Sequence, residues 1–226
     1  MRRDAVPVAE RYIETAASLG IVPDGRGPEV VVPQEIVSRV ATMMDRYRLE
    51  RAPLVVGFAP SARHATKRWP AERYRDLGIL LAKERRARLL LFGGPEDADY
   101  CGDIAQMINV ELGAGAAESL AGSLTLLETA TALDHCGVVV TNDSGLMHVA
   151  SGRGRPIVAI FGSTVKEFGF FPYGTRNIIV ERPGLSCRPC SHIGLDHCPE
   201  GHFRCMKEIS VDEVAAAVRS VDGSAG

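Results

Sequence analysis

From about position 53 onward, two kinds of apolar segment alternate along the chain. Short runs such as 138–140 and 157–160 contain no polar position, as expected of strands that are covered on both faces. Longer stretches follow them, with apolar positions every three or four residues, which is the pattern of an amphipathic helix. Strands that alternate with helices in this way predict a parallel sheet built from βαβ units.

The alternation predicts individual elements. The strands are expected at 54–58, 88–92, 137–141, 156–161 and 177–181, and the helices at 71–85, 97–108, 124–136, 145–152 and 211–220. We therefore predict a Rossmann-like doubly wound α/β domain over residues 51–226. In such a domain, ligands bind at the C-terminal ends of the strands.

Residues 1–50 follow a different pattern. Two helical patterns, 8–19 and 34–47, are separated by a connector rich in Gly and Pro at 21–28 and by a short apolar run at 30–32. This part has too few apolar positions for a core of its own. We interpret it as a linker, or as the remnant of an N-terminal domain.

Composition narrows the class of protein. Of 226 residues, 46% are hydrophobic and 24% are charged, with a formal net charge of -2, which is ordinary for a globular protein and gives no reason to expect nucleic acid as a partner. No apolar run reaches the roughly 20 residues that span a bilayer, and none follows the charged N-terminus as in a signal peptide. We expect a cytoplasmic protein without a transmembrane segment, whose cysteines are reduced.

The most informative motif joins the apolar run 138–140 to the helix predicted from position 145. Asp143 or Ser144 is placed to cap this helix, and Gly145 allows a ligand close to the backbone. The free N–H groups at the helix start then form a phosphate site, with His148 on a face that can look toward it. The alternative is that Asp143 is only a cap and that His148 only packs.

Three further loops follow predicted strands. The first contains Ser61 and Lys67, and a cation there can neutralise charge on a phosphate leaving group. In the second, Glu96 and Asp97 are carboxylates that could accept hydrogen bonds from ribose, or simply favour the start of a helix. Ser163 and Thr164 form the third loop. Together, the strand ends predict a single ligand crevice.

In order along the chain, these motifs resemble glycosyltransferase family 9, the lipopolysaccharide heptosyltransferases. The resemblance covers about residues 53–222 and rests on Lys67–Pro70, Gly93–Pro95, Leu120–Leu124, Asn142–Ala150 and Phe161–Thr164. The segment 185–206, with its four cysteines, resembles the heptosyltransferase II branch. The resemblance implies the C-terminal domain of a GT-B glycosyltransferase, which binds ADP-heptose as donor and requires no cofactor.

The resemblance also implies roles for individual residues. Lys67 and Asp143 would be catalytic, at the phosphates and at the heptose hydroxyls. The donor would otherwise be held by Ser61, Glu96 or Asp97, Leu124 against adenine, Ser144, Gly145, His148, Ser163 and Thr164. The family has Glu two residues after the loop proline, where this chain has Asp97, so Glu96 is a substitute for the ribose contact.

Four cysteines, Cys187, Cys190, Cys198 and Cys205, fall within one short segment. The C-x2-C spacing followed by two more cysteines is compatible with tetrahedral zinc, although it is irregular for a zinc ribbon. Reduced thiols that shape a loop are the favoured alternative. Cys101 and Cys136 lie in helical patterns and are expected to be buried.

The family implies an acceptor domain that precedes the donor domain and holds the lipopolysaccharide core at the inner face of the inner membrane. Two other functions stay open: another GT-B enzyme such as a nucleotide-sugar epimerase, and a catalytically inactive binding module. Residues 1–50 contain neither the Gly-rich loop nor the general base of the family's N-terminal domain. We therefore expect these 226 residues to bind donor and to transfer little.

We predict that the purified chain shows no measurable heptosyl transfer, because it holds no acceptor hydroxyl in line with the anomeric carbon. Mass spectrometry of a heptose-deficient lipopolysaccharide after incubation with ADP-heptose checks this. A fusion behind a family N-terminal domain is the comparison. Clear transfer by the chain alone would place the base within these residues.

Overall fold

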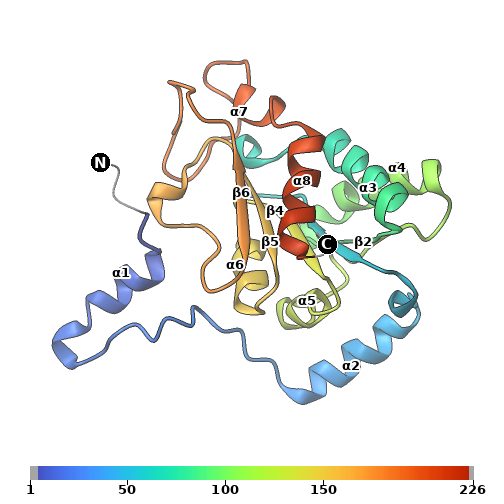
Figure 1. Cartoon of the computed structure of the whole chain (residues 1–226), viewed down its shortest axis with the longest axis horizontal. Coiled ribbons are helices and arrows are strands. Elements are labelled where there is room, and N and C mark those ends of the chain that lie inside the picture. The colour runs from blue at the N-terminus through green and yellow to red at the C-terminus, as the bar shows by residue number, and fades with distance from the viewer. Residues whose placement is uncertain (1–4, 224–226) are drawn as a thin grey trace.

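A computed structural model describes residues 5–223, so the charged N-terminus lies outside it. The centre is a six-stranded sheet, parallel throughout, in the order β3-β2-β1-β4-β5-β6 (Figure 1). The strands are β1 Val55–Ala59, β2 Arg88–Leu91, β3 Ala117–Ser119, β4 Val138–Asn142, β5 Ile157–Phe161 and β6 Asn177–Glu181. The predicted α/β fold is confirmed.

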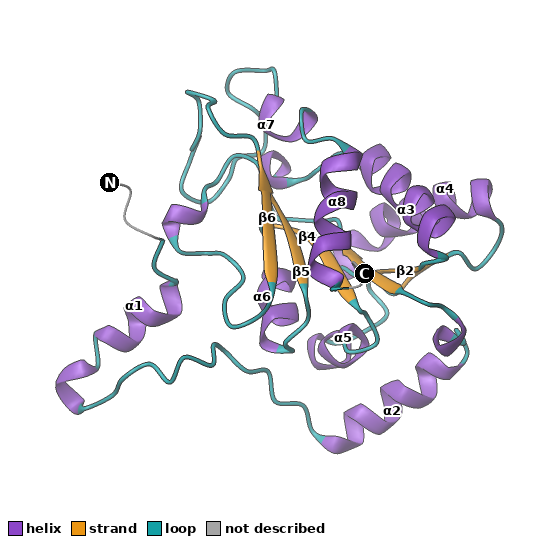
Figure 2. Ribbon diagram, viewed as in Figure 1, coloured by secondary structure: helices purple, strands orange, loops and turns teal. Residues whose placement is uncertain are grey.

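Helices cover both faces of this sheet (Figure 2). The α-helices are α1 Val8–Glu14, α2 Gln34–Asp45, α3 Ala71–Arg85, α4 Ala98–Leu112, α5 Leu126–Leu133, α6 Gly145–Gly152, α7 Arg204–Lys207 and α8 Val211–Asp222. Short 3-10 helices are η1 Ala17–Leu19, η2 Leu49–Arg51, η3 Ala65–Lys67, η4 Pro95–Asp97 and η5 Lys166–Phe168. Helices α3, α4 and α8 pack on one face, and α2, α5 and α6 on the other.

The core has two layers because successive side chains of a strand point to opposite faces. Val56 and Phe58 of β1 belong to the layer under α3 and α4, whereas Val55 belongs to the layer under α2 and α5. In β4, Val138 and Val140 face the first layer in the same way. The uninterrupted apolar runs are therefore explained by burial on both sides, as the sequence predicts.

Among the strands and α-helices of residues 5–223, the sequence did not predict β3 and α7. Edge strand β3 has only three residues, too few to show a hydrophobic period. The side chain of Asn109 in α4 pairs with the backbone of the first residue of β3. It donates to the carbonyl of Ala117 at 2.8 Å and accepts from the N–H of Ala117 at 2.9 Å. Helix α7 is four residues long and lies at the end of the cysteine segment, where no period is visible; Cys205 is one of its residues.

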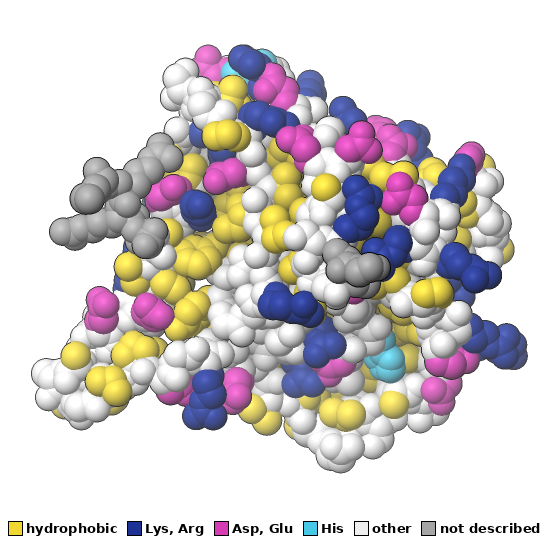
Figure 3. Space-filling view, viewed as in Figure 1, with side chains coloured by type: hydrophobic (Ala, Val, Ile, Leu, Met, Phe, Trp, Pro, Cys, Tyr) yellow, Lys and Arg dark blue, Asp and Glu magenta, His cyan; other side chains and the backbone are white. Residues whose placement is uncertain are grey.

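The first fifty residues divide into two parts. Helix α1 has no buried residue and lies apart from the sheet, joined to α2 by an extended connector (Figure 1). Exposed hydrophobic side chains, Tyr12 and Leu19 among them, belong to this segment. Figure 3 shows hydrophobic patches on the same side of the molecule. Helix α2, by contrast, buries Val40 and Met44 in the second layer of the core. Between residues 5 and 223, no helix combines the length and apolar character needed to cross a membrane.

A buried amide connects the sheet to the loops above it. Oδ1 of Asn142, the last residue of β4, accepts from the N–H of Trp69 and from the Tyr74 hydroxyl, both at 3.2 Å. Its Nδ2 donates to the carbonyl of Pro60 at 2.6 Å. All these contacts are buried, and burial raises the pKa of Tyr74 well above its usual value, so its hydroxyl stays a donor.

We predict that Asn142→Leu destabilises the fold by about 2–4 kcal/mol, because it leaves a buried hydroxyl, N–H and carbonyl without partners. Tyr74→Phe removes one hydrogen bond together with its donor and should cost only about 1 kcal/mol. Urea unfolding of both variants measures the difference. Equal losses would show that the amide is not the centre of this network.

Candidate functional site

The candidate site lies at the C-terminal ends of β1, β4 and β5. The strand order reverses direction between β1 and β4, because β2 and β3 extend to one side and β5 and β6 to the other. Such a switch point leaves a crevice above the strand ends. Three predicted loops meet there: the loop that carries Lys67, the turn at Asp143 and the loop at Thr164.

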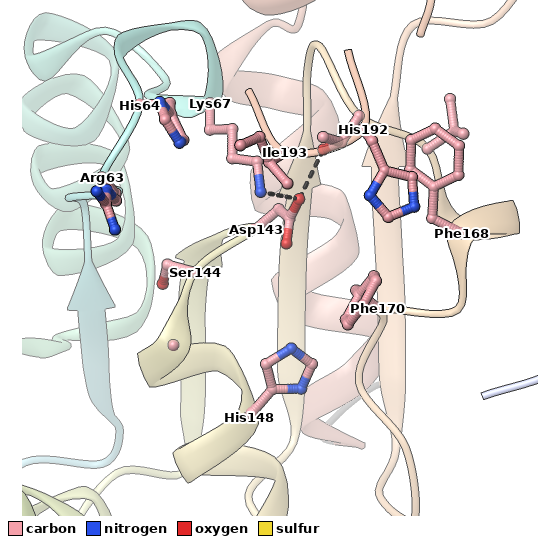
Figure 4. Close-up of a pocket in the computed structure, with 13 residues that line it drawn as sticks. Arg63, His64, Lys67, Asp143, Ser144, His148, Phe168, Phe170, His192 and Ile193 are labelled. Carbon is pink, nitrogen blue, oxygen red and sulfur yellow. Dashed lines mark hydrogen bonds and ion pairs between the residues drawn. The ribbon is translucent and has the colours of Figure 1, made fainter. Parts of the chain in front are cut away.

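An ion pair forms the centre of the site (Figure 4). Nζ of Lys67 lies 2.7 Å from Oδ2 of Asp143, and the Thr164 hydroxyl donates to the same oxygen at 2.6 Å. The two charged side chains are only 15% and 7% exposed. Because both contacts use Oδ2, the Oδ1 atom of Asp143 can accept a hydrogen bond from a ligand.

His148 projects from α6 toward this pair (Figure 4). Burial lowers its pKa from the usual 6.5, opposed by the nearby Asp143 carboxylate and assisted by the Lys67 ammonium. The imidazole is therefore neutral near pH 7. A neutral imidazole can donate one hydrogen bond and accept another.

The N-terminus of α6 opens into the crevice. Ser144 occupies the N-cap position, but its side chain makes no capping hydrogen bond, and Asp143 is held by Lys67 and Thr164. The prediction that one of these residues caps the helix through its side chain is thus not met. The first N–H groups of a helix have no partner within it, and beside Gly145 there is open space. These donors are free to bind an anion.

Two cavities meet at this helix start. The first, which we call the Asp143 cavity, has a volume of about 600 Å³ and contains Lys67, Asp143 and His148. The second, the Asp97 cavity, has a volume of about 580 Å³. They share three residues: Arg63, Ser144 and Gly145. An extended ligand can therefore cross the N-terminus of α6 with one end in each cavity.

Two predicted carboxylates lie in the Asp97 cavity. Asp97 accepts hydrogen bonds from the Ser61 hydroxyl through Oδ1 and from the N–H of Gly94 through Oδ2, at 3.1 Å for the latter. Ser61 and Asp97 therefore brace each other across two loops. Glu96 is exposed at the same cavity, so both carboxylates are within the crevice.

Two predicted residues lie elsewhere. Leu124 packs against the second layer of the core, and the apolar residues in the Asp97 cavity are Ala62, Phe92, Leu126 and Leu146. Ser163 is buried behind the crevice and donates to the Thr66 hydroxyl at 3.0 Å. Leu126, two positions after Leu124, is exposed at the first position of α5, and the sequence carries no signal that separates the two.

Sequence reasoning missed one wall of the Asp143 cavity. Phe168, Phe170 and His192 line it, together with the exposed Ile193. The two phenylalanines follow β5 in a loop without a recognisable motif. His192 lies among the cysteines, in a segment whose sequence shows no period. Arg63, which the sequence did not single out, also lines both cavities.

The cysteine segment does not form a metal site. Within residues 5–223, no three His, Cys, Asp or Glu side chains are arranged to hold a metal ion, so the zinc hypothesis has no support. Cys190 instead donates through Sγ to the carbonyl of Cys187 at 3.0 Å, and its N–H donates to the carbonyl of Ser163. Cys205 is buried in the core, which raises its pKa to about 11. The thiols are free, and the backbone N–H of Cys190 joins the segment to the loop of Ser163.

The fold and the crevice define a class. A doubly wound sheet with an open helix N-terminus, a cation and carboxylates at its switch point is typical of domains that bind nucleotides with a phosphate chain.

Comparison with known proteins identifies the family. The sequence model described as glycosyltransferase family 9 (heptosyltransferase) matches residues 28–198. The chain is 30% identical over 174 residues to lipooligosaccharide heptosyltransferase 2 of Haemophilus influenzae, covering 74% of this chain and 50% of that protein. It is 33% identical over 172 residues to lipopolysaccharide heptosyltransferase 2 of Salmonella typhimurium, covering 74% and 49%. The chain belongs to glycosyltransferase family 9.

Solved structures agree with this assignment. The Escherichia coli ADP-heptose lps heptosyltransferase II aligns with a TM-score of 0.68 and 25% identity over 86% of this chain and 53% of that one. A family 9 glycosyltransferase from Veillonella parvula aligns with a TM-score of 0.80 and 24% identity over 98% and 61%, which shows the shared fold. The chain spans about half the length of the curated relatives it matches.

We predict that His148 makes the protein less stable in weak acid. As the pH falls through 6.5, the unfolded chain takes up a proton at this residue, whereas the folded protein, in which the pKa is lowered, does not. The contribution of His148 to the free energy of unfolding is therefore fully present above pH 6.5 and declines as the pH falls below this value. Urea unfolding at pH 7.5 and 5.5 should show a smaller decline for His148→Gln than for the parent chain. Parallel declines would contradict the buried, neutral imidazole.

Proposed function

We propose that this chain binds ADP-heptose, as the donor half of an inverting heptosyltransferase that extends the lipopolysaccharide inner core. The observation that carries the proposal is the pair of cavities that meet at the start of α6. A nucleotide sugar has the matching three parts: a nucleoside, a diphosphate and a sugar. Each part meets suitable chemistry in the crevice.

The diphosphate would lie at the junction of the two cavities. The free N–H groups at Ser144 and Gly145 and the positive end of the helix dipole favour an anion there. Arg63 lines the same junction and adds a positive charge. Lys67 lies on the side of the Asp143 cavity, where it can neutralise charge that builds on the departing ADP.

The nucleoside would occupy the Asp97 cavity. Glu96 and Asp97 offer carboxylate oxygens to ribose hydroxyls, and Asp97 is already fixed by Ser61 and Gly94. Leu126 and Leu146 supply apolar surface for a base. We therefore assign the adenine contact to Leu126 instead of Leu124.

The sugar would enter the Asp143 cavity. Oδ1 of Asp143 can accept from a sugar hydroxyl, while Lys67 and Thr164 hold Oδ2 and fix the carboxylate. The neutral His148 can donate or accept at a second hydroxyl. The Asp143 carboxylate and the His148 imidazole would thereby both bind the donor sugar. We propose that residues of an acceptor domain hold the lipopolysaccharide acceptor and deprotonate its hydroxyl, consistent with the chain matching about half of its relatives' length.

Calorimetry tests donor binding. We expect heat of binding with ADP and with ADP-heptose, and none with UDP-glucose at the same concentration. Failure of both adenine ligands to bind to folded protein would refute the proposal.

Two variants locate the ligand. Lys67→Ala should weaken ADP-heptose binding by about 1.5–3 kcal/mol, since it removes a charge-assisted contact and leaves Asp143 buried without its counterion. Asp143→Ala should weaken ADP-heptose more than ADP, because its free oxygen faces the sugar. Lys83→Ala, whose exposed ion pair with Glu111 lies outside the crevice, is the matched control. Unchanged affinity in both site variants would place the ligand elsewhere.

A further inference from the structure

Three aromatic rings form one side of the Asp143 cavity; we call Phe168, Phe170 and His192 the ring wall. The His192 ring lies between the other two (Figure 4). Its centroid is 4.5 Å from that of Phe168, at an interplanar angle of 38°, and 6.1 Å from that of Phe170, at 88°. The residues come from two segments more than twenty positions apart, so the wall exists only in the folded chain.

The ring wall faces the polar groups of the cavity. Lys67, Asp143 and His148 lie across from the rings, so that one side of the cavity offers charge and hydrogen bonds and the other offers aromatic surface (Figure 4). A pyranose has the same division, because its hydroxyls radiate from the ring edge while C–H groups cover its faces. Binding sites for small molecules combine apolar lining with a few placed polar groups in this way.

The apolar surface of the wall is uncovered. Phe170 is 36% exposed and the adjoining Ile193 is 62% exposed, although both border a cavity large enough for a sugar. Covering such surface is favourable through the hydrophobic effect and dispersion. A ligand whose hydroxyls reach Asp143 is in position to cover it.

The loop that carries the phenylalanines is held from behind by α1. The N–H of Val8 donates to the carbonyl of Gly169 at 3.0 Å, and Arg11 donates to the carbonyls of Phe168 and Glu167 at 3.2 and 3.3 Å. Gly169 has a φ of +91°, and a Cβ there would lie 2.7 Å from the Val6 carbonyl oxygen. Only glycine allows this approach.

The loop that carries His192 is tied to the loop of Lys67. Thr66 donates through its N–H and its hydroxyl to the carbonyl of Leu195, both at 3.0 Å, and its hydroxyl oxygen accepts from the N–H of Leu195 at 2.8 Å. These bonds join the loop that carries His192 to the loop that carries Lys67. A wall ordered before binding loses little entropy when a ligand arrives.

We propose that the ring wall receives the C–H face of the donor sugar and thereby determines how tightly the sugar, as distinct from the nucleotide, is bound. The inference rests on the proposed function, since it assumes that a nucleoside diphosphate sugar crosses the start of α6. It assigns to Phe168, Phe170 and His192 the role of specificity-determining residues. The cysteine segment thereby contributes to binding through the histidine that it carries.

The test compares ADP-heptose with ADP by calorimetry on the full chain. We expect His192→Ala to lower the affinity for ADP-heptose about three- to tenfold, the range for a lost aromatic contact. The same variant should change the affinity for ADP by less than about twofold. His192→Phe keeps a ring and should retain the parent affinity for the sugar nucleotide. Phe170→Leu, which keeps apolar volume but removes a ring, should weaken ADP-heptose by less than His192→Ala.

His197→Ala is the matched control, because His197 is exposed on the same loop but outside the Asp143 cavity. Thermal unfolding of each variant confirms that it is folded. Three results would overturn the inference: His192→Phe as weak as His192→Ala, equal losses for ADP and ADP-heptose, or unchanged ADP-heptose affinity in His192→Ala. If the parent chain fails to bind ADP at all, the proposed function fails instead.

Discussion

The junction between β1 and β4 is the constraint on which the site depends. The strand order reverses there, and the amide of Asn142 joins the end of β4 to the carbonyl of Pro60 and to the backbone of Trp69. These contacts place the loop between Pro60 and Trp69 directly beside the residue that follows β4. Lys67, within that loop, consequently meets Asp143 at 2.7 Å. A neutral hydrogen-bond network thus positions a charged pair.

The Lys67–Asp143 pair is so buried that losing either partner would destabilise the protein. It can nevertheless still bind a ligand. Removing one member of a buried pair leaves an uncompensated charge, which is unfavourable, so each of the two charged side chains depends on the other. Both Lys67 and Thr164 contact one carboxylate oxygen of Asp143, and the other oxygen is left for the cavity. Burial also keeps His148 neutral, so that it offers hydrogen bonds and adds no further charge.

In the cysteine segment, composition left two alternatives open, a metal site and reduced thiols that shape a loop. Four thiols with a C-x2-C spacing are compatible with metal, but Cys205 belongs to the core and Cys190 bonds to backbone. The segment packs against the loops at Thr66 and Ser163 instead. The segment contributes His192 to the wall of the crevice. This contribution depends on where the loop lies, and the capacity of its side chains to bind a metal plays no part in it.

By itself, the sequence determined the sheet except for its short edge strand β3, because burial on both faces leaves an uninterrupted apolar run in a strand. It also determined the main covering helices and the strand ends that carry Lys67 and Asp143, because a parallel sheet gathers its C-terminal ends at one edge. Local patterns also sufficed to place Ser144 and Gly145 at the start of a helix, because both residues closely follow a strand in sequence. Only the tertiary structure decided which distant side chains meet. Phe168 and His192 stack at 4.5 Å across two loops without any period, and such contacts depend on packing between segments that no local pattern records.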